Sequence, residues 1–229
     1  MPRNKNKNNQ PAPRGASLAP QAAPVNPDGV LDSLGKKLKK NKNIVIGAVA
    51  AVIIAAAAWA AWEQLQEKKY QAQWQALFAA ELEIMKSAER SLTPLENFAA
   101  QQPSTEAGVY AAFTLGNIYY QSKDYPKAEV YFKQVMAHGN KYMAPMAETS
   151  LIAAQVAAQN YPAAIAQADA FAAAYPAHFA MAQVKHYKVL AQELAGQTAA
   201  AKEGYAGIVL DYPNTYYSAF AQQRLGDMK

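Results

Sequence analysis

Residues 112–132 read AFTLGNIYYQSKDYPKAEVYF, and this stretch decides the fold. Two small residues in it, Gly116 and Ala128, stand among large side chains. The large ones are Leu115, Tyr119, Tyr125 and Phe132. Small positions framed by large ones are typical of two helices that touch closely while bulky neighbours fill the space around the contact. The stretch therefore predicts a pair of packed helices, with a turn just before Tyr125.

Composition points to helices throughout the rest of the chain. Apolar residues make up 52% of the 229 residues, and alanine dominates them after residue 44. Alanine is the best helix former and is poor in strands. An apolar content of this size is also enough to build a packed core. The predicted fold class is all-α.

A period of 36–37 residues runs through the chain. Marker positions 103, 140, 176 and 213 are 37, 36 and 37 residues apart. An apolar residue stands five residues before each marker: Phe98, Val135, Phe171 and Ile208. The pattern of the second helix returns at residues 161–164 and 196–205, and Leu225-Gly226 begins the pattern again. Self-similarity at such a period indicates stacked structural units.

The order of these residues resembles the tetratricopeptide repeat, whose frame is a Leu-Gly pair, a tyrosine, a turn with tyrosine, an alanine and an aromatic residue. The resemblance covers about residues 72–229 and is strongest over 110–138. The period exceeds the roughly 34 residues of the family, and the second and third repeats lack the Leu-Gly pair in its usual place, which leaves the register of their first helices open. The resemblance implies that the repeats pack through Leu115, Gly116, Tyr119, Tyr125, Ala128, Phe132, Tyr161, Ala164, Ala201 and Tyr205.

A solenoid of this kind presents a concave groove lined by the first helix of each repeat. The resemblance places the partner-binding groove at Tyr110, Phe113, Asn117 and Tyr120. Three aromatic side chains in an open groove suit an apolar or extended peptide segment. The alternative is that these aromatics pack against the helix that precedes the repeats. Phe113 stands where relatives that clamp a C-terminal carboxylate carry a lysine, so that mode of binding is not expected.

An uncharged run of nineteen residues, 44–62, precedes the repeats. As a helix it would extend about 29 Å, close to the hydrocarbon thickness of about 30 Å. Five lysines lie in the cluster Lys36–Lys42 before the run, whereas two acidic and two basic residues cancel after it. The positive-inside rule then places the N-terminus in the cytoplasm. The apolar run is longer than the roughly 7–15 residues of a cleaved signal peptide, which favours a retained signal anchor.

The predicted organisation has four parts. Residues 1–43 form a disordered basic cytoplasmic tail. Within it, a short amphipathic turn over 30–40 either lies on anionic lipid headgroups or is a solvated segment that stops membrane insertion. Residues 44–62 are a transmembrane signal anchor. Residues 63–92 form a helical stalk and the first solenoid helix, and residues 93–229 hold the repeats and a C-terminal capping helix.

Nothing in the sequence assembles a catalytic site. The chain has no cysteine, no phosphate-binding glycine loop and no nucleophile elbow. Its three histidines, His138, His178 and His186, have no acidic partner at a ligand-like spacing. We expect no catalytic residue, no metal, no cofactor and no enzymatic activity. Residues 1–43 carry a net charge of +7 and residues 44–229 a net charge of −2, so the folded part is not built for nucleic acid.

The whole layout resembles the ancillary SecYEG translocon subunit family of bacterial inner membranes. That resemblance implies a single-pass inner-membrane protein with its repeats in the periplasm, where it would link exported polypeptides to chaperones. The expected partners are translocon subunits, exported polypeptides or periplasmic chaperones, together with membrane lipid along 44–62 and Lys36–Lys42. The alternative is a structural scaffold for an envelope or secretion complex.

Overall fold

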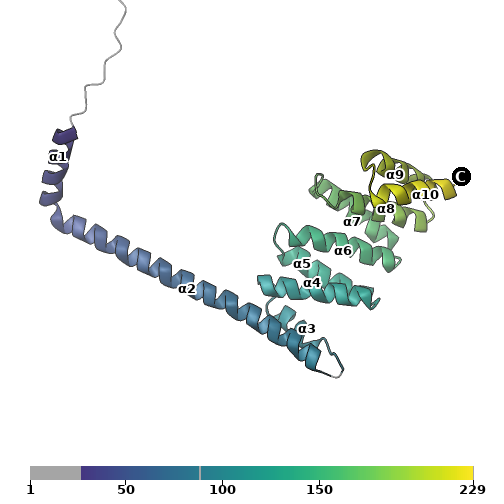
Figure 1. Ribbon diagram of the computed structural model, residues 1–229, viewed down its shortest axis with the longest axis horizontal. Coiled ribbons are helices and arrows are strands. Elements are labelled where there is room, and N and C mark those ends of the chain that lie inside the picture. Colours follow the sequence, from purple (N-terminus) through teal and green to yellow (C-terminus); the bar gives the residue numbers. More distant parts are fainter. Residues whose placement is uncertain (1–26, 88, 229) are drawn as a thin grey trace, which may run out of the picture. The chain divides into compact units, whose positions relative to one another are not determined.

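The computed structural model describes residues 27–87 and 89–228, and every regular element in them is an α-helix (Figure 1). The all-α prediction is confirmed: a long apolar helix comes first and a stack of shorter helices follows. The chain divides into two compact units, Met1–Glu63 and Gln64–Lys229.

The first unit contains helix α1 (Pro27–Lys40) and the beginning of α2 (Lys42–Lys86). Helix α1 covers the segment 30–40, where an amphipathic turn was expected, while residues 1–26 lie outside the described part of the chain. Lys37, Lys39 and Lys40 in its last turn suit the negative end of the helix dipole.

The N-terminal half of α2 is long and apolar enough to cross a membrane. Its most apolar window of 18 residues has a mean hydropathy of 2.5, and none of that window is buried against protein. Val52, Ile53 and Ile54 expose 62–69% of their surface. A helix that exposes large aliphatic side chains on all faces lacks the polar face of a water-soluble surface helix. The same helix continues without a break to Lys86.

The second unit is a stack of helices that pack on their neighbours in chain order. After the end of α2, the helices are α3 (Thr93–Gln101), α4 (Glu106–Gln121), α5 (Tyr125–His138), α6 (Met143–Ala157), α7 (Tyr161–Ala174), α8 (Met181–Leu194), α9 (Thr198–Asp211) and α10 (Tyr216–Asp227). Contacts also link α4 to α6, α6 to α8 and α8 to α10, whereas none of comparable closeness links α5 to α7 or α7 to α9 among the described residues. The stack is therefore tighter along α4, α6, α8 and α10, which form the inner layer of a curved solenoid.

The turn inside each helix pair has the same backbone conformation in three successive repeats. Lys123, Gln159 and Gly196 have φ values of 64°, 61° and 76° and lie between α4 and α5, α6 and α7, and α8 and α9. A left-handed residue at the end of a helix reverses the chain within a few residues. Because the turns are alike, each pair presents its first helix to the same side of the stack.

The ten expected packing residues lie at the contacts between helices. Eight of them are buried, and Tyr125 and Tyr161 are half-buried. Leu115 and Ala128 have no exposed surface, and 1% of Phe132 is exposed. A Cβ atom added to Gly116 would lie 2.6 Å from Cε1 of Phe132, so α4 and α5 touch at this glycine.

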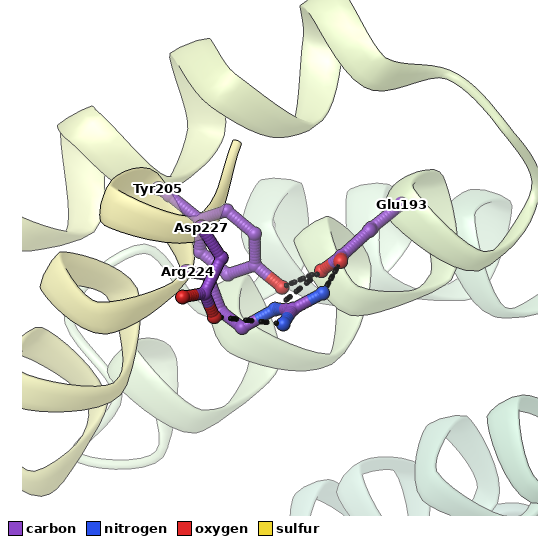
Figure 2. Close-up of polar contacts among 4 residues, drawn as sticks. All are labelled: Glu193, Tyr205, Arg224 and Asp227. Atoms are coloured by element: carbon purple, nitrogen blue, oxygen red, sulfur yellow. Dashed lines mark hydrogen bonds and ion pairs between the residues drawn. The ribbon is translucent and has the colours of Figure 1, made fainter. Parts of the chain in front are cut away.

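A hydrogen-bonded carboxylate ties helices together at each end of the stack. Near the start, Glu96 of α3 accepts hydrogen bonds from the hydroxyls of Tyr119 and Tyr131. Near the end, Figure 2 shows the Tyr205 hydroxyl and the Arg224 guanidinium directed at the same Glu193 carboxylate. The Tyr205 oxygen lies 2.6 Å from Glu193 Oε2. The bond from Arg224, with a lesser one from Tyr205, lowers the pKa of Glu193 although burial opposes the shift.

Candidate protein-binding groove

The inner layer contains a cavity of about 140 Å³ that is shared by three helices. Helix α4 contributes two side chains to it, α6 three and α8 two, and one aromatic ring reaches it from α5. These residues are Asn117, Tyr120, Phe132, Thr149, Ser150, Ala153, Gln183 and Tyr187. The cavity thus lies where neighbouring repeats meet on the concave side.

The cavity lining is polar and aromatic but carries no charge. The hydroxyls of Thr149 and Ser150 donate to carbonyls of their own helix, at 3.0 and 3.1 Å. Gln183 Nε2 donates to the Tyr187 hydroxyl oxygen at 3.2 Å. The Tyr187 proton and the Gln183 carbonyl oxygen remain available to a ligand, as does the amide of Asn117. These groups match the donors and acceptors of a peptide backbone.

Two tyrosines of the inner layer line the cavity, Tyr120 on α4 and Tyr187 on α8. Burial raises the pKa of Tyr120, and the neighbouring Tyr187 raises it further. The same two causes, in the same order, raise the pKa of Tyr217 on α10. Rings that bear a hydroxyl combine apolar contact area with hydrogen bonding.

The four expected groove residues do not share one site. Asn117 and Tyr120 line the inner cavity. Phe113 is half-buried and its ring centroid lies 6.1 Å from that of Phe132, within the core. Tyr110 is 45% exposed and lies 5.9 Å, between ring centroids, from Trp74 of α2. Tyr110 thus follows the alternative in which an aromatic packs against the preceding helix.

Tyr110 and Trp74 border a second cavity of about 270 Å³. Its other walls come from the turns that join one repeat to the next: Ser104, Glu106, Val109, His138, Asn140 and Met143. Asn140 is occupied as a cap, since its Oδ1 accepts from the backbone N–H groups of Tyr142 and Met143 at 3.0 Å each. This cavity lies at the edge of the stack and is separate from the inner one.

Ser150, Gln183 and Tyr187 were not among the expected groove residues. The repeat period contained a signal for them: one period after Phe113 is Ser150, and a second period ends within one residue of Tyr187. The spacing varies between 36 and 37 residues, and the first helices of the second and third repeats lack the Leu-Gly pair that would set their register. A shift of one residue turns a helical side chain by about 100°, enough to move it from groove to core.

None of the three histidines lines the inner cavity. His186 is buried on α8, with its ring centroid 4.8 Å from that of Phe220 and 5.3 Å from that of Tyr217 on α10. His178 belongs to the turn after α7, where its Nδ1 accepts from the N–H of Ala180 at 3.2 Å. Within residues 27–87 and 89–228, no three His, Cys, Asp or Glu side chains gather as a metal site would require.

Comparison with known proteins gives one positive result. A family model described as a tetratricopeptide repeat-like domain matches residues 37–228. No curated protein sequence matches the chain. The family match spans the last turn of α1, the apolar helix and all the repeats, which is more than half of the chain.

Proposed function

Because the chain belongs to the tetratricopeptide repeat-like domain family, whose repeats are protein-interaction modules, we propose that it is a membrane-anchored adaptor that holds extended polypeptide segments in its inner groove. The observation that carries this proposal is the uncharged cavity shared by α4, α6 and α8, with Tyr120 and Tyr187 in its wall. An extended chain offers it alternating carbonyl and N–H groups, together with side chains that can lie on the rings.

The absence of charge from this cavity favours broad over narrow selection of partners. A groove that recognises a particular acidic or basic motif needs a fixed opposite charge, because charge complementarity gives most of the discrimination. Hydroxyl and amide groups instead accept any backbone. Exported polypeptides that have not yet folded are partners with this chemistry.

The anchor and its orientation complete the proposal. The apolar part of α2 serves as a retained signal anchor in a bacterial inner membrane, with the basic N-terminal segment in the cytoplasm and the repeats in the periplasm. The Lys36–Lys42 cluster and the balanced charges after Trp62 support this orientation. Placed beside the protein-export channel, the groove would meet polypeptides as they emerge and pass them to periplasmic chaperones.

Crosslinking from the groove tests this function against a scaffolding role. A photo-crosslinking amino acid replaces Tyr187 in the full chain, and a matched control replaces Ala195 in the exposed turn between α8 and α9. An adaptor gives many different exported polypeptides at position 187, each at low yield, and few at position 195. A single partner captured at fixed stoichiometry from position 187 would show that the protein is a scaffold instead.

A further inference from the structure

The two edges of the solenoid carry different side chains. The turns that join one repeat to the next, with the first residue of the helix that follows, expose three large aromatics: Tyr142, Phe179 and Tyr216 are 66%, 83% and 74% exposed. Tyr142 directly precedes α6, Phe179 lies in the turn before α8, and Tyr216 is the first residue of α10. We call these three side chains the aromatic edge. The turns inside the repeats, at 122–124, 158–160 and 195–197, contain no aromatic residue.

We propose that the aromatic edge rests in the headgroup layer of the bilayer that anchors the chain. Tyrosine and phenylalanine exposed at the tips of turns resemble the aromatic belts that membrane proteins place at the lipid–water interface. None of the three lines either cavity described above, so the edge offers a peptide no recess. A headgroup layer needs no recess, because it deforms around side chains that insert from a convex edge.

The charges along this edge suit phospholipid. The four turns between repeats, 102–105, 139–142, 175–180 and 212–215, contain no Asp or Glu. Lys141 Nζ lies 5.1 Å from the centre of the Tyr142 ring, so a cation accompanies an exposed aromatic. Asp211, which ends α9 beside the last turn, is bound by Lys185 at 2.7 Å. One acidic side chain, Glu106 at the start of α4, lies beside the first of these turns, 102–105.

The path of α2 brings the chain into the solenoid at this same edge. Trp74 contacts Tyr110, which lies in the second turn of α4, and shares a cavity with residues of two turns between repeats. After Trp74 the helix is held by burial of Leu77 and Ala80, whereas residues 64–72 are exposed and lie beyond the stack.

Because the same chain is anchored in the bilayer, weak contacts between this edge and lipid are sufficient. A tethered surface experiences a high effective concentration of its binding partner, and three modest side-chain insertions then act together. The proposal rests on the membrane anchorage proposed above, and it is independent of what the inner groove binds.

Paramagnetic quenching in vesicles tests the proposal. The natural chain has no cysteine, so a single fluorophore can be attached through Ala177→Cys, in the turn beside Phe179, or through Ala195→Cys on the opposite edge. Both alanines are exposed turn residues. The full chain is reconstituted in phosphatidylcholine–phosphatidylglycerol vesicles that contain headgroup-spin-labelled lipid. We expect several-fold stronger quenching at 177 than at 195.

A triple variant identifies the side chains responsible. Tyr142→Ser, Phe179→Ser and Tyr216→Ser in the Ala177→Cys chain should reduce quenching to the level at 195, with the melting temperature unchanged because all three residues are exposed. Equal quenching at 177 and 195, or strong quenching that survives the triple substitution, overturns the proposal. Flotation of the vesicles reports the anchor separately: a chain that does not float refutes the anchorage and this proposal with it, while leaving the groove untouched.

Discussion

Gly116 of α4 lies against the ring of Phe132 on α5, so closely that an added Cβ atom would come within 2.6 Å of the ring. The first complete helix pair is therefore closed around a position that only glycine fits. Substitution Gly116→Ala should lower the free energy of unfolding, because overpacking costs about 1–3 kcal/mol and exceeds the gain in helix propensity of up to about 1 kcal/mol. Chemical denaturation of the full chain measures the difference.

Gly207→Ala is the matched control for this substitution. Gly207 lies within α9, and a Cβ atom added there meets nothing within 4 Å. The same chemical change should then stabilise the protein by about 0.5–1 kcal/mol, since only the helix propensity changes. Equal effects of the two substitutions would mean that α4 and α5 do not touch at Gly116.

Removal of Arg224 should loosen the last helix. In Arg224→Gln the Glu193 carboxylate still accepts the hydrogen bond from the Tyr205 hydroxyl but loses its cationic partner. Only 14% of the Glu193 side chain is exposed, so water cannot fully replace that partner. Each repeat contacts only its neighbours, so amide hydrogen exchange should accelerate in α10 and remain unchanged in α4 and α5. Lys127→Gln removes a surface ion pair with Asp124 at 3.8 Å and should leave α10 unchanged. Unaltered exchange in the α10 of Arg224→Gln would show that the ion pair does not hold this helix.

Two buried groups predict separate acid-sensitive ranges. Burial lowers the pKa of His186 below its ordinary 6.5, so the unfolded chain binds a proton that the folded chain does not. Stability should fall as the pH drops below about 6.5. Glu193 has a pKa below its ordinary 4.5, so its contribution is present above that value and is lost as the pH falls through the lowered pKa.

The substitution His186→Phe separates the two pH ranges in which stability should fall. Phenylalanine suits the aromatic surroundings of Tyr217 and Phe220 and cannot titrate. The variant should lose much less of its melting temperature between pH 7.5 and 5.5 than the natural chain, while both should weaken below pH 4.5. If the two proteins lose equally between pH 7.5 and 5.5, His186 is not the group that responds.

Orientation in the membrane can be read with single cysteines, since the natural chain has none. In intact bacterial spheroplasts an impermeant maleimide should label Ala195→Cys in the repeats. It should label Ser17→Cys in the basic N-terminal segment only after lysis, because the Lys36–Lys42 cluster keeps that end in the cytoplasm. Labelling in the reverse order would invert the proposed topology.

The sequence was most informative where local chemistry decides the structure. Three local signals predicted the helix pairs and the residues through which the two helices of a pair pack. These signals are the Leu-Gly pair, the turn before Tyr125 and the period of 36–37 residues. The amphipathic pattern over residues 30–40 predicted a helical turn in a segment that α1 covers.

The groove was harder to predict, because its walls come from residues about 30–37 positions apart. Of the expected groove residues, Asn117 and Tyr120 line the inner cavity. Tyr110 stands at a groove position of its repeat, but Trp74 of α2 lies beside it. Tertiary packing decides which of two apolar surfaces covers an aromatic side chain. The periodic pattern along one helix does not predict that choice.

Capture of an unfolded polypeptide by the groove tests the central claim most directly. The full chain in lipid nanodiscs is titrated against fluorescent, permanently unfolded α-lactalbumin, with Tyr120→Ser/Tyr187→Ser as the test variant and Tyr110→Ser as the control outside the inner cavity. Loss of two rings at about 1–2 kcal/mol each should raise the Kd by roughly tenfold or more. Helical content should be retained, and Tyr110→Ser should bind like the natural chain. A double variant that stays folded and binds with an unchanged Kd would contradict the account and move the binding site away from the groove.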